Sequence, residues 1–483
     1  MTDQLLDRAL SRLSGEGLDF GDVRCVNRRT EWITARGDRI DNHQQTDEQG
    51  YCVRAVVQGV WGSAAGVVSG EMAMDQLVER AVANARQRVE RGAKSRALYP
   101  RTTEGGQWQT PVVKDPFGVS LDEKYGLILS ANEKMSLAES RVIATESQLV
   151  TQQNETRVRA TDGLAFDQVQ TSCGGGIQAI ARGEEGRTQS RSYPKSHEGE
   201  ILQGGWEVVD GLDLLGHCDR VAVEAGLLTA APPMPDQIAT IILHGSQLSL
   251  QVHESVGHPL ELDRVLGDEI SLAGGSWAQR DKLGTRYGSE IVNLVSDPTR
   301  SGALGSFGWD DDGTPSHRSD LVRDGILVGY LSGWQSAGRA GYEPAGTARS
   351  DGWAGYPIDR MANVDLEPGT AGSLADLIAD TESGFLLSNN RSWSIDQLRL
   401  NFQFGCEVAW EIKNGELGTM YRDPLYVGRT PEFWGNCDAI CGPEAWHSWG
   451  WYFCGKGDPM QLAHVGHGVA PARFRNVQVR SAS

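Results

Sequence analysis

The first part of the chain alternates helical and strand-like patterns of apolar residues. Leucine and alanine recur at helical spacing over residues 5–13, so a helix is predicted there. Two further helices are predicted over 74–89, where six apolar residues share one face, and over 122–135. Between the first two, YCVRAVVQGVWGSAAG (51–66) predicts a strand, a glycine-containing turn and a second strand.

A change of pattern near residue 232 predicts a domain boundary. Residues 141–183 alternate apolar and polar positions in short runs, as successive antiparallel strands do. A helical stretch over 211–230 then ends at the proline cluster APPMPD (231–236), which is typical of a linker. We therefore expect an N-terminal α/β domain over 1–232 and a second domain over 236–483.

The second domain is expected to be rich in β-strands. QIATIILHG (237–245) has the pattern of a buried strand, and SQLSLQVHESVGH (246–258) that of a helix with Ser246 as its N-cap. Beyond it, short β-like runs meet at an Asp-Gly turn (324–325) and an Asn-Gly turn (414–415), which are typical of hairpins. The expected fold class is α+β: an N-terminal α/β domain with an antiparallel sheet and helices, then a β-rich C-terminal domain.

Composition and charge narrow the class of protein. The 483 residues are 39% hydrophobic and 23% charged, as in ordinary globular proteins. The formal charge of −19 disfavours nucleic acid as a partner, and no apolar run approaches the roughly 18 residues of a membrane span. The first residues are acidic and amphipathic, unlike a signal peptide, so we expect a cytoplasmic protein whose eight cysteines are thiols or metal ligands.

The segment LQVHESVGHPLELD (250–263) carries the strongest chemical signal. His253 and His258 could bind zinc, with Glu254 beside them as a base for a water molecule. On a straight α-helix, however, residues five apart diverge by about 140°. Either the helix ends near Gly257, which we favour because Pro259 follows, or a π-type turn aligns the two histidines. The alternative is two ordinary polar residues near a helix end.

Four stretches resemble the TldD/PmbA family of metallopeptidases, in its catalytic, TldD type. LHGSQLSLQVHESVGHPLELD is similar to the HExxxH segment of that family, and GYCVRAVVQGVWGSAAG to its N-terminal strand-turn-strand. GWDDDGTPSHRSDLVRDGILVGYLSG resembles the segment after the metal helix, and CGKGDPMQLAHVGHGVAPARFRNVQV the C-terminal end. The resemblance follows the order of the whole chain.

The resemblance implies a set of site residues and a partner. It implies that His253, His258 and Cys454 bind Zn²⁺ and that Glu254 is the catalytic base. A His₂Cys set would also leave a coordination position open for water. The family further implies cleavage of unfolded or extended peptides, in the trimming of modified peptides or the degradation of small unfolded proteins. It also implies assembly with a related metal-free subunit or with a second copy.

The sequence leaves the roles of several neighbouring residues open. Asp263 could orient a ligating histidine or be a solvated loop residue, and the signal for Glu261 is weaker. Cys437 and Cys441 could belong to a separate structural zinc site, although buried free thiols are the simpler interpretation. His467 is a candidate pocket residue without a role. The tryptophans near Cys454 could line a substrate site or pack in the core: Trp434, Trp446, Trp449 and Trp451.

The leading hypothesis is a cytoplasmic zinc metallopeptidase with Glu254 as general base. One rival is a zinc amidohydrolase that acts on small molecules, which would need the same activated water. Another is a non-catalytic scaffold subunit, which the presence of His253, Glu254 and His258 disfavours.

Overall fold

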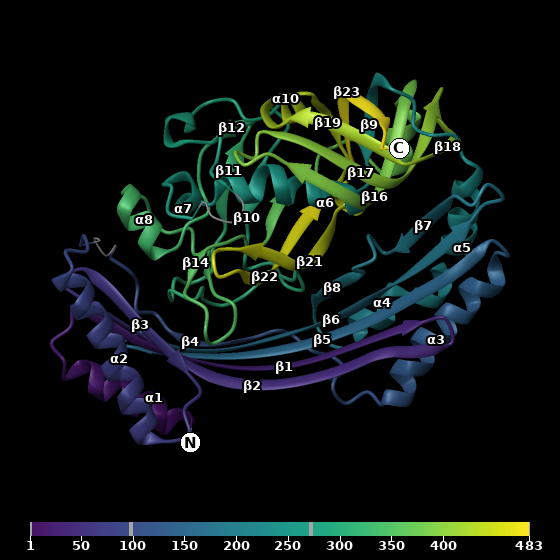
Figure 1. The fold of residues 1–483 in the computed structure, drawn as a ribbon. Coiled ribbons are helices and arrows are strands. Elements are labelled where there is room, and N and C mark those ends of the chain that lie inside the picture. Colours follow the sequence, from purple (N-terminus) through teal and green to yellow (C-terminus); the bar gives the residue numbers. More distant parts are fainter. Residues whose placement is uncertain (1, 96–99, 270–273, 483) are drawn as a thin grey trace.

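A long, curved sheet, antiparallel except where β4 pairs in parallel with β6, forms the N-terminal part of the protein (Figure 1). The computed structural model describes residues 2–95, 100–269 and 274–482, so the outer domain limits predicted at residues 1 and 483 lie outside the described residues. The strand order is β3-β2-β1-β5-β6-β4, and β7 and β8 both pair with β6. The bounds are β1 (Phe20–Arg36), β2 (Arg39–Val57), β3 (Val60–Gly66), β4 (Gly106–Gln109), β5 (Val142–Ala160), β6 (Ala165–Arg182), β7 (Thr188–Tyr193) and β8 (Glu200–Gln203).

Helices pack against the two ends of this sheet (Figure 1). At one end lie α1 (Thr2–Ser14) and α2 (Glu71–Glu90), whose apolar faces form a core with β1 and β2. At the other end lie α3 (Leu121–Ala138), α4 (Glu207–Leu212) and α5 (Leu214–Ala230), with a second core. The helices expected over 5–13, 74–89 and 122–135 are confirmed, as is the strand-turn-strand over 51–66.

A second sheet of seven strands organises the C-terminal part. Its order is β16-β9-β23-β19-β17-β18, with β20 paired to β23, and β16 also pairs with β17, so five strands form a closed ring. The bounds are β9 (Gln237–Leu243), β16 (Ser383–Ile395), β17 (Asn401–Lys413), β18 (Glu416–Arg422), β19 (Pro424–Arg429), β20 (Cys437–Ile440) and β23 (Ala472–Ser481). The predicted Asn-Gly hairpin joins β17 to β18, with positive φ at Asn414 and Gly415.

Smaller sheets and helices complete this part. A four-stranded sheet joins β12 (Ile326–Leu327), β11 (Ser319–Arg323), β10 (Leu294–Ser296) and β15 (Val364–Leu366), and its β11–β12 turn is the predicted Asp-Gly hairpin. Two strand pairs are β13 (Ala348–Arg349) with β14 (Ile358–Asp359), and β21 (His447–Lys456) with β22 (Gln461–Val469). The helices are α6 (Gly245–Val252), α7 (Leu262–Val265), α8 (Trp334–Ala340), α9 (Leu374–Ala379) and α10 (Thr430–Gly435). The expected α+β class and the β-rich C-terminal part are confirmed.

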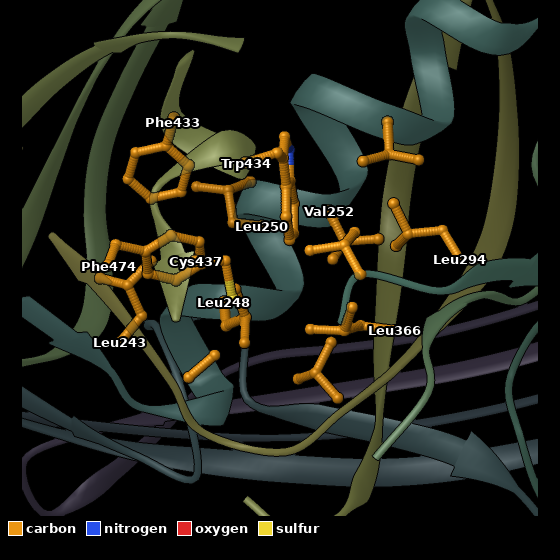
Figure 2. Packing of buried hydrophobic residues seen from close by; sticks show 14 of the residues in the cluster. Leu243, Leu248, Leu250, Val252, Leu294, Leu366, Phe433, Trp434, Cys437 and Phe474 are labelled. Atoms are coloured by element: carbon orange, nitrogen blue, oxygen red, sulfur yellow. The ribbon is translucent and has the colours of Figure 1, made fainter. Parts of the chain in front are cut away.

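Helix α6 lies inside the C-terminal core. All eight of its residues are buried, polar ones included. Figure 2 shows Leu248, Leu250 and Val252 packed among aromatic and aliphatic side chains from the surrounding strands and from α10. A helix buried on every side cannot slide or rotate without opening this core, so the segment that continues from it is held in a fixed place.

The C-terminal part sits on the concave face of the long sheet (Figure 1). A buried guanidinium, that of Arg54 on β2, contacts the carboxylates of Asp22 on β1 and Asp312. Tyr452 on β21 donates a hydrogen bond to Gln152 on β5, 2.7 Å away. These buried polar contacts fix the C-terminal part against the sheet. Among the described residues, no helix is both long and apolar enough to cross a membrane.

Candidate metal centre

The helix that carries the His-Glu…His motif changes its winding at the first histidine. Helix α6 ends at Val252, and residues His253–Gly257 form a π-helical turn in which the N–H of His258 donates to the carbonyl of His253. A 3₁₀ turn follows over His258–Leu260. The α-helix thus ends earlier than the favoured prediction placed it, although the winding does change again at Gly257, and the alternative, a π-type turn that aligns residues five apart, is confirmed.

The start of α6 also differs from the prediction. The N-cap is His244, whose side chain accepts a hydrogen bond from the N–H of Ser246, so Ser246 is not the cap. Ser246 instead lies buried inside the first turn, hydrogen-bonded to Asn389. The capping pattern misplaced this boundary because histidine is not among the usual N-cap residues.

Close packing explains the glycine before the second histidine. A Cβ at Gly257 would lie 1.9 Å from Sδ of the buried Met361, so no side chain fits there. The π-turn can therefore approach Met361 closely, and the two histidine rings come to lie with centroids 4.8 Å apart.

Cys454 on β21 completes a group of three metal-ligand side chains. One nitrogen each from His253 and His258 and Sγ of Cys454 lie within 4.8 Å of one another, and all three residues are buried. Sγ of Cys454 is 3.6 Å from Nε2 of His258. In a tetrahedral zinc site with ligand distances of about 2.0 Å for nitrogen and 2.3 Å for sulfur, these two atoms would be about 3.5 Å apart. The spacing therefore fits zinc.

A buried histidine on β22 fixes the tautomer of His253. Nδ1 of His467 is 2.9 Å from the carbonyl oxygen of Val364, which only accepts, so this Nδ1 carries the hydrogen. Burial lowers the pKa of His467 well below its usual value, so its ring is neutral and Nε2 can accept. That Nε2 is 2.8 Å from Nδ1 of His253. His253 thus donates from Nδ1 and keeps the Nε2 lone pair free for a metal.

Glu261, not Asp263, orients the second histidine. Nδ1 of His258 lies 3.2 Å from Oε2 of Glu261 and donates to it, which leaves Nε2 of His258 facing Cys454. Burial tends to raise the pKa of Glu261, but Lys456, His258 and Arg264 hold it well below the usual value. The carboxylate of Asp263 instead accepts from Nζ of Lys456 at 2.6 Å and from the backbone N–H of Asp359 at 3.3 Å. Asp263 is buried, so its interpretation as a solvated loop residue is also wrong.

The electrostatics of the group favour metal binding. Burial lowers the pKa of His253 to about 4 and also lowers the pKa of His258, so both imidazoles are neutral at pH 7. Burial alone would raise the pKa of Cys454, but the pKa is lowered overall, with the charge of Arg360 as the largest opposing cause. Neutral imidazoles and a readily ionised thiol are the forms that bind zinc.

The carboxylate of Glu254 points to a different partner. Glu254 is buried and forms an ion pair with Nη1 of Arg399, which lies in the loop between β16 and β17. Sequence reasoning missed Arg399, because the two residues are 145 positions apart and no local pattern links them.

The tryptophans and the other cysteines mostly belong to the core. Trp451 lies beside His253, with ring centroids 5.9 Å apart, whereas Trp434 is fully buried and donates to Ser255. Cys437 and Cys441 are buried free thiols whose pKa values burial raises. In the described part of the chain, His253, His258 and Cys454 form the one group of three or more potential metal ligands.

Comparison with known protein families covers nearly the whole chain. The model described as PmbA/TldA metallopeptidase C-terminal domain matches residues 236–481. Those described as domain 1 and the central domain of the same metallopeptidases match residues 21–85 and 114–226.

Individual relatives have metalloprotease names, and solved structures have a similar fold. A protein named metalloprotease from Methanothermobacter thermautotrophicus is 27% identical over 465 residues, 96% of this chain and 95% of that protein. A protein named zinc metalloprotease TldD homolog from Saccharolobus solfataricus is 25% identical over 191 residues, 39% of this chain and 41% of that protein. A Thermotoga maritima crystal structure described as a putative modulator of a DNA gyrase has a TM-score of 0.79 at 16% identity, covering 99% of this chain and 100% of that one. TldE from Thermococcus kodakarensis has a TM-score of 0.71 at 15% identity, with 99% of both chains covered.

Proposed function

This chain belongs to the PmbA/TldA metallopeptidase family, and from that premise we propose that it is a zinc-dependent peptidase. Its substrates are peptide bonds in unfolded or extended peptides. The observation that carries the proposal is the buried group of His253, His258 and Cys454 next to the carboxylate of Glu254.

The three side chains would hold Zn²⁺ through Nε2 of His253, Nε2 of His258 and Sγ of Cys454. Hydrogen bonds from Nδ1 of each histidine, to His467 and Glu261, keep these Nε2 lone pairs available. Zinc bound there would supply Lewis acidity, which acidifies a water molecule and polarises a carbonyl group.

Glu254 moves the proton. As general base its carboxylate takes a proton from the attacking water, whose oxygen forms a bond to the carbonyl carbon of the scissile peptide. The same proton then passes to the peptide nitrogen as the C–N bond breaks, which gives an amine and a carboxylic acid. Glu254 follows His253 directly and faces another side of the turn, so it supplies this function without being a ligand.

The approach that we propose for an extended peptide is a polar hollow beside the strand that pairs with β21. It lies between the long sheet and β22 and is lined by Gln152, Asn154 and Gln168 on one side and by Leu462, Ala463 and His464 on the other. Ala463 is the strand neighbour of Cys454. Side-chain amides can both donate to and accept from the peptide groups of a substrate, whatever its sequence.

The assembly we propose is a dimer, in the cytoplasm, with a related metal-free subunit or with a second copy of this chain. The similarity of the fold to TldE supports a related partner. The free cysteines support the location, because disulfide bonds are rare in the cytoplasm.

Paired measurements of zinc content and peptide turnover test the proposal. Purified wild type should contain one zinc per chain by elemental analysis. Single alanine variants of His253, His258 and Cys454 should lose both zinc and activity. Glu254→Ala should keep zinc and lose about a hundredfold to ten-thousandfold in turnover of an unstructured peptide, with the partner subunit supplied.

Two outcomes would contradict it. Undiminished zinc in Cys454→Ala would exclude the thiolate and turn attention to Cys437 and Cys441. Turnover by Glu254→Ala near the wild-type rate would exclude this residue as the base.

A further inference from the structure

The guanidinium group of Arg399, beside Glu254, has hydrogen-bond donors without acceptors. Nη1 forms the ion pair with Glu254, while Nε is buried and has no hydrogen-bond partner. Nη2 makes no hydrogen bond to any of the described residues either, but unlike Nε it is not among the buried atoms without a partner. Nε and Nη2 form one edge of the guanidinium plane, the edge that binds two oxygens of an anion side by side. Buried donors without partners are rare in native proteins, so this open edge calls for an acceptor.

The loop that carries Arg399 is rigid and strained. Arg399 has a left-handed backbone with φ of 59°, which non-glycine residues rarely adopt. Its N–H donates to the carbonyl of Asp396 at 2.9 Å, and its own carbonyl accepts from the hydroxyl of Thr430 at 3.0 Å. The carboxylate of Asp396 also accepts from the N–H groups of Leu398 and Leu400. Backbone strain that many contacts hold in place is typical of functional positions.

A purely structural ion pair does not explain this arrangement. To hold Glu254 in place, one donor of the guanidinium is sufficient, and the buried Nε would then remain without an acceptor, at a cost in stability. The guanidinium is held at the residue that follows His253 in the chain, because Nη1 pairs with the carboxylate of Glu254. The Nε–Nη2 edge therefore belongs to the same group that holds the proposed catalytic base.

We propose that Arg399 binds an anionic oxygen of the substrate through its Nε–Nη2 edge while Nη1 holds Glu254. This inference rests on the proposed peptidase function. Two substrate groups have the required chemistry. One is the C-terminal carboxylate of a peptide cut near its end, and the other is the oxygen of the scissile carbonyl, which becomes negatively charged as water adds to the carbon.

Two peptides with the same sequence distinguish which of these two substrate groups Arg399 binds. One has a free C-terminal carboxylate and the other an amidated C-terminus, and the zinc-loaded protein with its partner is assayed on both. If the edge binds the carboxylate, Arg399→Gln lowers kcat/KM for the free acid alone. If it binds the carbonyl oxygen, kcat falls about a hundredfold to a thousandfold on both peptides, as for the loss of an oxyanion donor. Equal activity of Arg399→Gln and wild type on both peptides would overturn the inference.

Two further variants exclude loss of fold or of charge as the cause. Arg399→Lys keeps the charge but not the two-donor edge, so it should recover only part of the lost activity. Arg429→Gln is a matched control, because it removes the same charge from a half-exposed arginine on β19 that pairs with Glu432. It should behave as wild type, and zinc content should stay at one per chain in all three variants.

A binding measurement keeps this inference distinguishable from the proposed function. Phosphinic peptides carry a tetrahedral anion and are not hydrolysed, and their affinity can be measured by calorimetry with free and amidated C-termini. Binding to Arg399→Gln at least tenfold weaker than to wild type supports the inference, whether or not wild type cleaves peptides. Equal affinities overturn it, and so does a wild type that binds neither analogue. Arg399-dependent binding without any cleavage would contradict the peptidase function alone.

Discussion

A single methyl group at position 257 tests why the two histidines can be five residues apart. Gly257 has φ of −55° and ψ of −67°, which alanine can adopt, so Gly257→Ala introduces no backbone strain. The new Cβ would instead lie 1.9 Å from Sδ and 2.9 Å from Cγ of Met361. Met361 is fully buried and cannot swing out to solvent. Either Met361 repacks or the π-turn moves, and His258 moves with it.

The expected loss of stability follows from two opposing effects. Overpacking of a core by one methyl group typically costs about 1–3 kcal/mol. Alanine in helical backbone is favoured over glycine by up to about 1 kcal/mol. Gly257→Ala should therefore lower the free energy of unfolding by up to about 2 kcal/mol. Met361→Ala alone should cost about 2–5 kcal/mol, and the double variant should cost less than the sum of the two, because the new methyl group fills part of the space left by Met361.

Urea unfolding of the metal-free protein measures these changes, and competition titration measures zinc affinity, which should fall about tenfold or more in Gly257→Ala. Gly126→Ala is the matched control: this glycine lies within α3 with nothing within 4 Å of an added Cβ, so it should be neutral or stabilising. Unchanged unfolding and unchanged zinc affinity in Gly257→Ala would refute the account. So would strictly additive effects in the double variant.

Three further predictions concern the surroundings of the site. His467→Leu should weaken zinc binding about tenfold to a hundredfold, as measured by competition titration. His467→Gln should keep most of the zinc affinity, because its amide can contact both neighbours of the imidazole. Equal zinc affinities of His467→Leu and wild type would contradict the tautomer argument. Burial lowers the pKa of His244 to about 4. Between pH 6.5 and pH 4 the unfolded state therefore binds one proton more than the folded state, so the free energy of unfolding decreases by about 1.4 kcal/mol for each unit by which the pH is lowered. His244→Asn should remove that much of the slope in urea unfolding of metal-free protein at pH 5–6.5, and an unchanged slope would exclude His244 as its source. Cys437→Ala should keep one zinc per chain by elemental analysis, whereas loss of zinc would point to a ligand other than Cys454.

Most of the fold could be predicted because its signals are local. The apolar face of α2 and the Asn414-Gly415 turn depend on residues within a few positions, and the structure has both. The π-turn could not be chosen over a helix end, because the decision depends on Met361, which the fold brings to Gly257 from far along the chain.

The candidate ligands were found through chemistry and resemblance, whereas their supporting residues were not. His467 and Arg399 act through contacts made by tertiary packing, whereas Glu261 meets His258 through the local 3₁₀ turn between them. Asp263 was a candidate to orient a histidine because of its place after the motif, but it lies on α7 and its carboxylate contacts Lys456. Sequence patterns identify residues that can bind a metal, but which carboxylate faces which imidazole is decided by packing.

The two sides of the metal centre are made at different times. His258 and Cys454 are 196 residues apart, and Cys454 lies near the end of the chain. At typical synthesis rates of about 5–20 residues per second, roughly 10–40 s pass between them. During that interval the nascent chain carries its histidines without a thiolate, and the β21–β22 hairpin, which holds Cys454 and His467, does not yet exist. A chain that stops early never assembles the centre. On the proposed function, a nascent chain therefore gains its full set of zinc ligands only after Cys454 has been made, and a copy that stops before it could not cut other unfinished chains.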